Sequence, residues 1–337
     1  MKNSHKLPFS SVSEPRRKSP RKNLVFKKLP KNHNLRVARP SVHDEKETAS
    51  LKISSGFDGF KLFVTLPVIV YSLLLIFLPI AYIFILSFFK SDNYGSYTFE
   101  FTLKNYLDAF DPTFFRIFFI SILIGLITTF ICLLISYPFA IFLRDKPEKT
   151  RNLIIKLVMV PFLTNSLIRT YGWITLLRKN GVINSGLLSL GIVDAPLSLM
   201  YNNLGLIIGM VYTLLPFMIL PVFSAVTKVD QNLLDAAEDL GAGEMKKFFK
   251  VYLPLTLPGA FNGSLMVFMP AIGYFFIADI LGGGKAMIIG NLVKNQFLTA
   301  RNWPLGAALS ILLLLMTFAL VKVYQKIGGD LDELGGG

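Results

Sequence analysis

The sequence contains very few residues that could build a metal or redox centre. Among its 337 residues there is one cysteine, Cys132, and there are three histidines, His5, His33 and His43. A single thiol cannot form a disulfide within the chain, and all three imidazoles fall in the same polar stretch at the amino terminus. We therefore exclude a metal or acid–base centre built from His or Cys in the apolar remainder of the chain.

Charge is also scarce, and it is unevenly distributed. Only 17% of the residues are charged, whereas a soluble domain of ordinary composition carries about 25%. The mean hydropathy is +0.54 and the net charge is +14. Residues 1–60 contain fourteen Lys or Arg against five acids, so this segment supplies most of that charge. The division predicts a membrane protein with a basic tail rather than a soluble basic protein.

The tail, residues 1–59, is rich in Lys, Arg, Ser, Pro and Asn and has no sustained apolar period, which predicts disorder. It is too long and too basic for a secretory signal peptide, and its acids argue against an organellar transit peptide. A nucleic-acid-binding arm is the alternative reading of its charge. We favour a solvated tail near the anionic headgroups of membrane lipid on the cytoplasmic side, and expect no nucleic-acid partner.

Long apolar runs dominate residues 60–327. A helix needs about 20 residues to cross about 30 Å of hydrocarbon. A run near Leu153–Leu177 is interrupted by two basic residues; we expect a short span from Leu153 to Ile168, with Arg169, Tyr171 and Trp173 at the membrane interface. Five further stretches are free of charge and long enough to span: Leu62–Phe89, Ile117–Leu143, Ala195–Thr227, Val251–Ala278 and Asn302–Val321. The expected fold is therefore all-α, a polytopic bundle of six transmembrane helices.

The distribution of basic residues predicts the orientation of these spans. Four basic residues lie between positions 144 and 151, after the second span, whereas residues 91–112 contain four acids and one Lys. Because loops rich in Lys and Arg stay in the cytoplasm, both termini and the loop Lys228–Lys250 are expected there. Residues 328–337 would form a short carboxy-terminal tail on the same side.

Two pairs of small residues predict close helix packing. Gly205 and Gly209 lie four residues apart in one span, as do Gly259 and Gly263 in another. Glycines at this spacing share one helix face and let a second helix approach closely.

The loop between the fourth and fifth spans is the most informative segment. Residues Asp230–Leu240 mix apolar and acidic side chains and predict a short helix. Gly241 and Gly243 are expected to end it, because glycine adopts the left-handed conformation at little cost. Apolar residues at positions i, i+3, i+4 and i+7 then predict a second helix. Two adjacent alanines in this elbow would let a partner's surface approach, and its acids would meet basic groups there.

The same loop resembles a known signature. An acid and two alanines are followed after three residues by Gly, and after nine more by an aliphatic residue, one further residue and Leu-Pro. This spacing resembles the EAA motif of the permease subunits of ABC importers, with Asp where Glu is usual. The resemblance implies that residues 230–250 hold a coupling helix that docks on an ATP-binding subunit. The matched positions are Asp235, Ala236, Ala237, Gly241, Val251, Leu253 and Pro254.

A wider resemblance covers most of the apolar part. Several stretches resemble the spermidine/putrescine permeases of the PotB type: Pro161–Phe162, Arg169–Trp173, Asn180–Asn184, Tyr212–Met218, Ile280–Gly284, Gln296–Leu298 and Arg301–Gly306. The resemblance implies a bacterial inner-membrane permease (MetI-like architecture) for a small cationic polyamine. It also implies a second permease subunit, two ATP-binding subunits and an external solute-binding protein as partners. A permease for an oxyanion such as sulfate or molybdate is the alternative, since such permeases share the elbow.

The chain itself is not expected to hydrolyse ATP. Gly282–Lys285 superficially resembles a phosphate-binding loop, but Asp279 and Ala286 occupy positions that require Gly and Ser or Thr. We therefore expect no metal and no cofactor in this chain, with ATP and magnesium used by the partner subunit. The rival classes, a membrane-embedded enzyme and an assembly scaffold, lack support: no convergent titratable groups lie in the spans, and a scaffold would not need the elbow's spacing.

The substrate path is expected near the fifth span. Pro270 removes a backbone donor there, which indicates either a simple kink or an element of the path. Asp279, at the outer end of this span, would attract a cation beside aromatic rings that hold ammonium groups; the alternative is that it pairs with Arg169 or with water. The expected lining residues are Tyr212, Pro270, Tyr274, Phe275, Asp279 and Arg169.

Overall fold

The computed structural model describes residues 59–92 and 95–326. Contacts within the chain separate residues 1–65 from residues 66–337, and the helical bundle belongs to the second unit. The expected basic tail, up to residue 58, and the expected carboxy-terminal tail lie outside the described residues.

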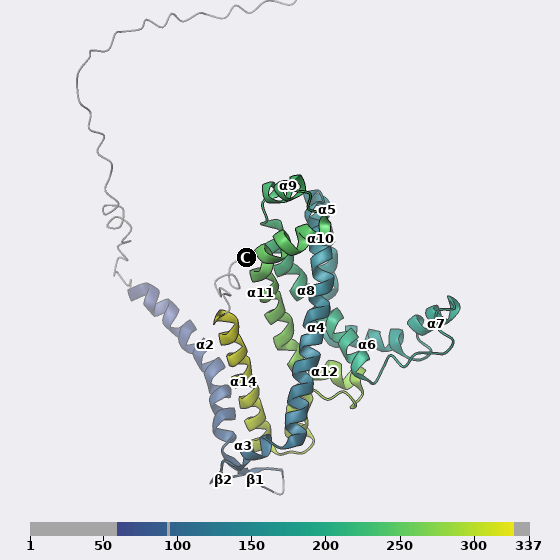
Figure 1. Cartoon of the computed structure of the whole chain (residues 1–337). Coiled ribbons are helices and arrows are strands. Elements are labelled where there is room, and N and C mark those ends of the chain that lie inside the picture. Colours follow the sequence, from purple (N-terminus) through teal and green to yellow (C-terminus); the bar gives the residue numbers. More distant parts are fainter. Residues whose placement is uncertain (1–58, 93–94, 327–337) are drawn as a thin grey trace, which may run out of the picture. The chain divides into compact units, whose positions relative to one another are not determined.

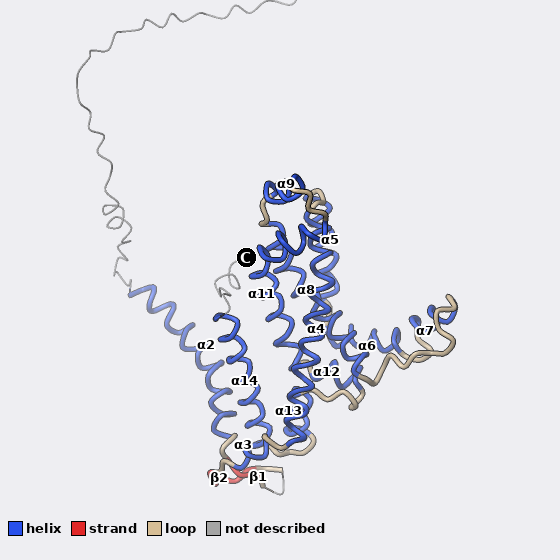
Figure 2. The backbone as a smooth tube through the Cα atoms, viewed as in Figure 1, coloured by secondary structure: helices blue, strands red, loops and turns tan. Residues whose placement is uncertain are grey.

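The described residues are mainly helical (Figures 1 and 2). Five helices are long and apolar enough to cross a membrane, which confirms five of the expected spans. Four of them are α4, α8, α11 and α14; the fifth is α2, whose spanning part begins at Thr65. Their bounds are Gly59–Leu86 for α2, Pro112–Arg144 for α4, Asn203–Thr227 for α8, Leu253–Gly273 for α11 and Trp303–Lys326 for α14.

The sixth apolar segment is bent, so the expected span Leu153–Ile168 is not one straight helix; counted as one span, the bent pair of helical segments brings the described spans to six. The helical segments Glu148–Leu163 and Ser166–Ser189 meet at an angle of 95°. Pro161, which has no N–H to donate, lies in the 3₁₀ turn before the bend. Asn165 then accepts a hydrogen bond from the backbone N–H of Leu167 and starts a new helix. The parts are α5 (Glu148–Met159), η1 (Val160–Leu163), α6 (Ser166–Leu177) and α7 (Val182–Ser189).

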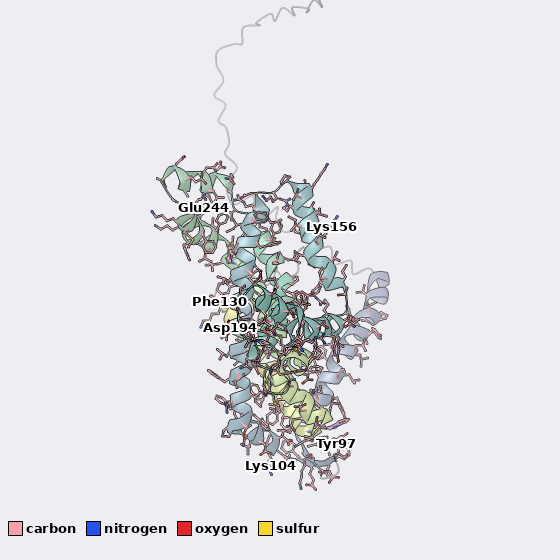
Figure 3. All side chains as sticks on the ribbon, turned by 90° about the vertical axis from the view of Figure 1, so that its right-hand side faces the viewer. Tyr97, Lys104, Phe130, Lys156, Asp194 and Glu244 are labelled. Atoms are coloured by element: carbon pink, nitrogen blue, oxygen red, sulfur yellow. The ribbon has the colours of Figure 1, made fainter. Side chains whose placement is uncertain are left out.

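Short elements lie at the two ends of the bundle. At one end, strand β1 (Phe89–Ser91) pairs antiparallel with β2 (Tyr97–Phe101), and α3 (Lys104–Ala109) follows. At the other end lie α9 (Gln231–Asp239) and α10 (Glu244–Lys247). Figure 3 shows this separation, with Glu244 toward one end and Tyr97 and Lys104 at the opposite end.

The core forms around α8, against which α4 and α11 pack. Residues four apart on α8 share one face of the helix, because 3.6 residues make a turn. One such series along α8 is completely buried: Leu206, Met210, Leu214, Met218, Val222 and Val226.

The glycine pairs sit where helices meet, as expected. A Cβ atom on Gly259 of α11 would lie 2.8 Å from the carbonyl oxygen of Pro221 in α8. One on Gly263 would lie 2.7 Å from the sulfur of Met218. Both distances are shorter than a real Cβ contact, so α11 can approach the α8 backbone only because these residues have no side chain.

Candidate functional site

The elbow between α8 and α11 has the expected form, with one correction. The Asp230 side chain accepts a hydrogen bond from the backbone N–H of Asn232, 3.0 Å away, and α9 starts there. Gly241 ends this turn with φ +74°, the left-handed conformation expected of it. Gly243 has φ −68° and instead precedes α10, so its expected role in ending the helix is wrong.

The elbow presents a mixed apolar and acidic surface. Leu234 alone on α9 is buried, 4% exposed, and it anchors the helix to the core. Asp235 and Ala236, two of the motif residues, are exposed, and Ala237 is half-buried. Leu240, at the tip, is 88% exposed. Apolar groups this exposed beside carboxylates are typical of a surface that another protein covers.

A buried lysine holds the two arms of the elbow together. The Lys247 ammonium lies 2.5 Å from a carboxylate oxygen of Glu238 on α9. It lies 2.6 Å from a carboxylate oxygen of Glu244 on its own helix. Because only 8% of Lys247 is exposed, water screens these two ion pairs less than it would on an open surface. Lys247 therefore links α9 to the helix that follows the turn, although both carboxylates are exposed to water.

An arginine connects the elbow to the end of α4. Arg144 donates hydrogen bonds to the Tyr252 hydroxyl (2.6 Å), the Val229 carbonyl (2.9 Å) and the Gln231 side-chain oxygen (3.0 Å). The Gln231 amide in turn donates to Asp235, 2.8 Å away. The motif acid is thus linked through two side chains to the second span.

The last motif residues, Val251, Leu253 and Pro254, lie where the elbow joins the span. The expected second elbow helix is not separate: α10, the π-helix η2 (Phe248–Tyr252) and α11 form one continuous helix, Glu244–Gly273. Pro254 is the second residue of α11, just after the π-helix, and a proline that cannot donate to the helical ladder suits such a change of register. Val251 and Leu253 pack against the core.

The fifth span breaks earlier than expected. Helix α11 ends at Gly273, and Tyr274 leaves the helical conformation with ψ 67° while its N–H still donates to the Pro270 carbonyl. Two short elements follow, α12 (Phe275–Ile277) and the π-helix η3 (Ala278–Gly282). Pro270 therefore lies near the end of α11 rather than in the middle of a span reaching Ala278.

Asp279 has partners within the chain. One carboxylate oxygen lies 2.6 Å from the ammonium of Lys294, on α13 (Ile289–Leu298), and the other accepts from the amide of Asn291 at 2.5 Å. The suggested pairing with Arg169 is wrong, because Lys294 takes that place. The Lys294 ammonium also lies 5.9 Å from the ring centre of Phe275. Asp279 and Phe275 thus belong to one charge-compensated cluster.

Arg169 belongs to a second cluster, which is aromatic. Its guanidinium carbon lies 5.2 Å from the ring centre of Phe162 and 5.8 Å from that of Tyr212. Trp173, one turn further along α6, packs edge-on against Tyr212 at 5.2 Å. Tyr274 packs against the core, and its ring centre lies 5.3 Å from that of Phe276. The fold therefore brings Arg169 and Tyr212 together, whereas the charged partner of both Asp279 and Phe275 is Lys294.

Three of these residues were not identified from the sequence. Arg144 counted there only as one of four basic residues after the second span, and nothing local indicates partners 85 to 108 residues away. Lys247 carries a signal, since Glu244 precedes it by three residues on a helix. Phe162 lies in a stretch of the wider resemblance, but its contact with Arg169 depends on the bend between η1 and α6.

Relatives of this chain are found among curated proteins, although no family model matches it. It is 44% identical over 260 residues to the spermidine/putrescine transport system permease protein PotB of Haemophilus influenzae, covering 77% of this chain and 91% of that protein. The PotB protein of Escherichia coli is 43% identical over 260 residues, covering 77% and 94%. The inner membrane ABC transporter permease protein YdcU of Escherichia coli is 30% identical over 260 residues, covering 73% and 82%.

Solved structures share the fold. A chain of a bacterial alginate ABC transporter, in complex with an alginate-bound periplasmic protein, superposes with a TM-score of 0.65 at 15% identity. The superposition covers 79% of this chain and 93% of that chain. These comparisons establish an inner-membrane transport subunit, not an enzyme. With at least 43% identity across more than nine-tenths of two PotB relatives, the chain belongs to the family of ABC-importer permease subunits that includes the spermidine/putrescine permease proteins PotB.

Proposed function

We propose that this chain forms part of the path by which an ABC importer carries a polyamine, such as spermidine or putrescine, across the inner membrane. The observation that carries the proposal is the 43–44% identity to proteins named as spermidine/putrescine permeases, over nearly their whole length. The aromatic cluster of Phe162, Tyr212 and Trp173 around Arg169 supports it. Aromatic rings attract ammonium groups and also contact the methylene chains between them.

One observation favours the oxyanion alternative. Arg169 has no carboxylate within ion-pair distance among the residues that the structure describes. An uncompensated guanidinium suits sulfate or molybdate better than a polyamine. The identity to polyamine permeases outweighs this single residue, and the oxyanion stays the second candidate.

The elbow serves as the coupling element. Its exposed Asp235, Ala236 and Leu240 would sit in a groove of an ATP-binding subunit, and Gly241 supplies the tight turn. Arg144 would transmit a displacement of α9 to α4, while the continuous helix from Glu244 transmits it to α11. The spans would then rock between inward-facing and outward-facing states around the region of Pro270 and Tyr274.

The proposed assembly contains two ATP-binding subunits, a second permease subunit and an external solute-binding protein. The elbow end, marked by Glu244 in Figure 3, would face the cytoplasm together with both termini. The β-hairpin end, marked by Tyr97, would face the solute-binding protein. The concentration of basic residues in the tail and near Arg144 supports this orientation.

Uptake of labelled substrate tests the proposal. A strain that lacks its own polyamine importers would receive this subunit together with its cognate partners. We expect ATP-dependent uptake of radiolabelled spermidine or putrescine, and no uptake of sulfate or molybdate. Uptake of an oxyanion without any polyamine would refute the proposal and establish the second candidate.

A further inference from the structure

Arg169 is placed unusually for a cation in an apolar chain. It lies on the first turn of α6, just after the 95° bend that follows η1. Its Nε atom is buried without a hydrogen-bond partner among the described residues. Its guanidinium faces two rings, at 5.2 Å from Phe162 and 5.8 Å from Tyr212. Arg169 is half-buried, and removing part of a cation from water without a counter-ion costs free energy, which the contacts with the two rings offset.

The rings that hold this guanidinium are themselves held by their neighbours. Tyr212 lies on the core helix α8 and has Trp173 edge-on at 5.2 Å. Phe162 packs edge-on against Phe217 of the same helix at 4.9 Å. Rings fixed in this way form a site for a cation that does not depend on Arg169 itself, since the guanidinium makes no hydrogen bond with any residue that the structure describes. An ammonium group would fit between the same faces.

We infer that Phe162 and Tyr212 form a binding subsite for an ammonium group of the substrate, and that Arg169 occupies this subsite as a tethered competitor in the conformation seen here. The inference rests on the proposed function, because only a cationic substrate would use the subsite. It also accounts for the one residue that favours an oxyanion. Arg169 keeps the path closed to cations until it is displaced, and it repels a cation that arrives while it is in place.

The bend before α6 gives Arg169 a means of leaving. Residues Thr164 and Asn165 separate η1 from α6. The backbone hydrogen bonds of α6 begin where the N–H of Arg169 donates to the carbonyl of Asn165. A rotation of α6 about this junction would withdraw Arg169 while Phe162, on the other side of the junction, stays with η1. Tyr212 stays with the core. The subsite would thus survive the movement that empties it.

Binding of radiolabelled spermidine to the purified complex, without solute-binding protein or nucleotide, tests the inference. The complex contains both permease and both ATP-binding subunits. Arg169→Gln should bind spermidine about tenfold more tightly than the native complex, the size of effect that two ring contacts confer. Arg169→Lys, which keeps a tethered cation, should bind like the native complex. Adding Tyr212→Leu to Arg169→Gln should abolish the gain.

Unchanged or weaker spermidine binding in Arg169→Gln would overturn the inference. Where that variant fails to assemble, Arg169→Met, of similar length and apolar, replaces it with the same expectation. A complex that takes up polyamine in cells yet shows no gain with either variant refutes the subsite and leaves the proposed function standing. A complex that takes up no polyamine in cells fails at the proposed function instead.

Discussion

Two glycines in the elbow allow backbone strain to be separated from simple bulk. Gly241 has φ +74° and Gly243 has φ −68°, and a Cβ atom on either would meet nothing within 4 Å in this chain. Alanine at either position therefore adds a methyl group into open space. Only at Gly241 does it force an L-residue into the left-handed region.

The cost of that conformation sets the expected effect. A left-handed L-residue costs about 1–2 kcal/mol, which shifts an equilibrium by roughly 5–30-fold. Gly241→Ala should lower the fraction of permease that retains its ATP-binding subunit by about that factor, because the turn no longer holds α9 in its docking position. Gly243→Ala should leave it unchanged or raise it slightly, since alanine restricts the unfolded chain more than glycine does.

Copurification of the ATP-binding subunit with tagged permease, at limiting ATP-binding subunit, is the measurement. ATP-dependent uptake in the same strains is the second readout. Gly241→Asn completes the set, because asparagine tolerates the left-handed region but has a larger side chain. If Gly241→Asn retains more ATP-binding subunit than Gly241→Ala, backbone strain is the cause. If it retains less, the larger side chain intrudes on the partner. Equal effects of the two alanine variants would refute the reasoning.

Three further predictions concern coupling, packing and orientation. Arg144→Ala removes three hydrogen bonds between α4 and the elbow. In proteoliposomes it should lower the amount of substrate moved per ATP hydrolysed, and Arg144→Lys should give a value between those of the native protein and Arg144→Ala. Gly259→Ala should lower the free energy of unfolding by about 1–3 kcal/mol, because the added methyl group overpacks against α8. Gly172→Ala should not lower it, because open space surrounds that position. In a variant without the native cysteine, Ser96→Cys should react with an impermeant thiol reagent in intact cells, and Thr150→Cys only after permeabilisation; the reverse pattern would invert the proposed orientation.

Local sequence was sufficient where a feature depends on neighbouring residues. Apolar runs long enough to span a membrane located α2, α4, α8, α11 and α14, because hydrocarbon requires backbone hydrogen bonds to be made within the segment. The first helix of the elbow was equally accessible, since a short helix and a left-handed glycine after it follow from adjacent residues, whereas Gly243 and the second helix were not predicted correctly.

The breaks in the helices could not be placed in this way. Proline at position 161 precedes a 95° bend, and Pro270 lies four residues before the break at Tyr274. Pro216 and Pro221, however, lie inside the continuous helix α8. A proline weakens the helical ladder at all four positions, and tertiary packing decides which of them becomes a break. The ring partners of Arg169 could not be predicted for the same reason, because the bend determines what this side chain touches.

The core helix α8 connects the elbow to the aromatic cluster. Tyr212, in the cluster, lies on α8, and Val229, whose carbonyl accepts from Arg144, follows directly after the helix. At 1.5 Å per residue these two points are about 25 Å apart. The completely buried stripe from Leu206 to Val226 lets α8 tilt or shift only together with α4 and α11, since a close-packed interior transmits strain rather than absorbing it. A displacement of the elbow by an ATP-binding subunit would therefore reach the rings around Arg169 through one packed helix.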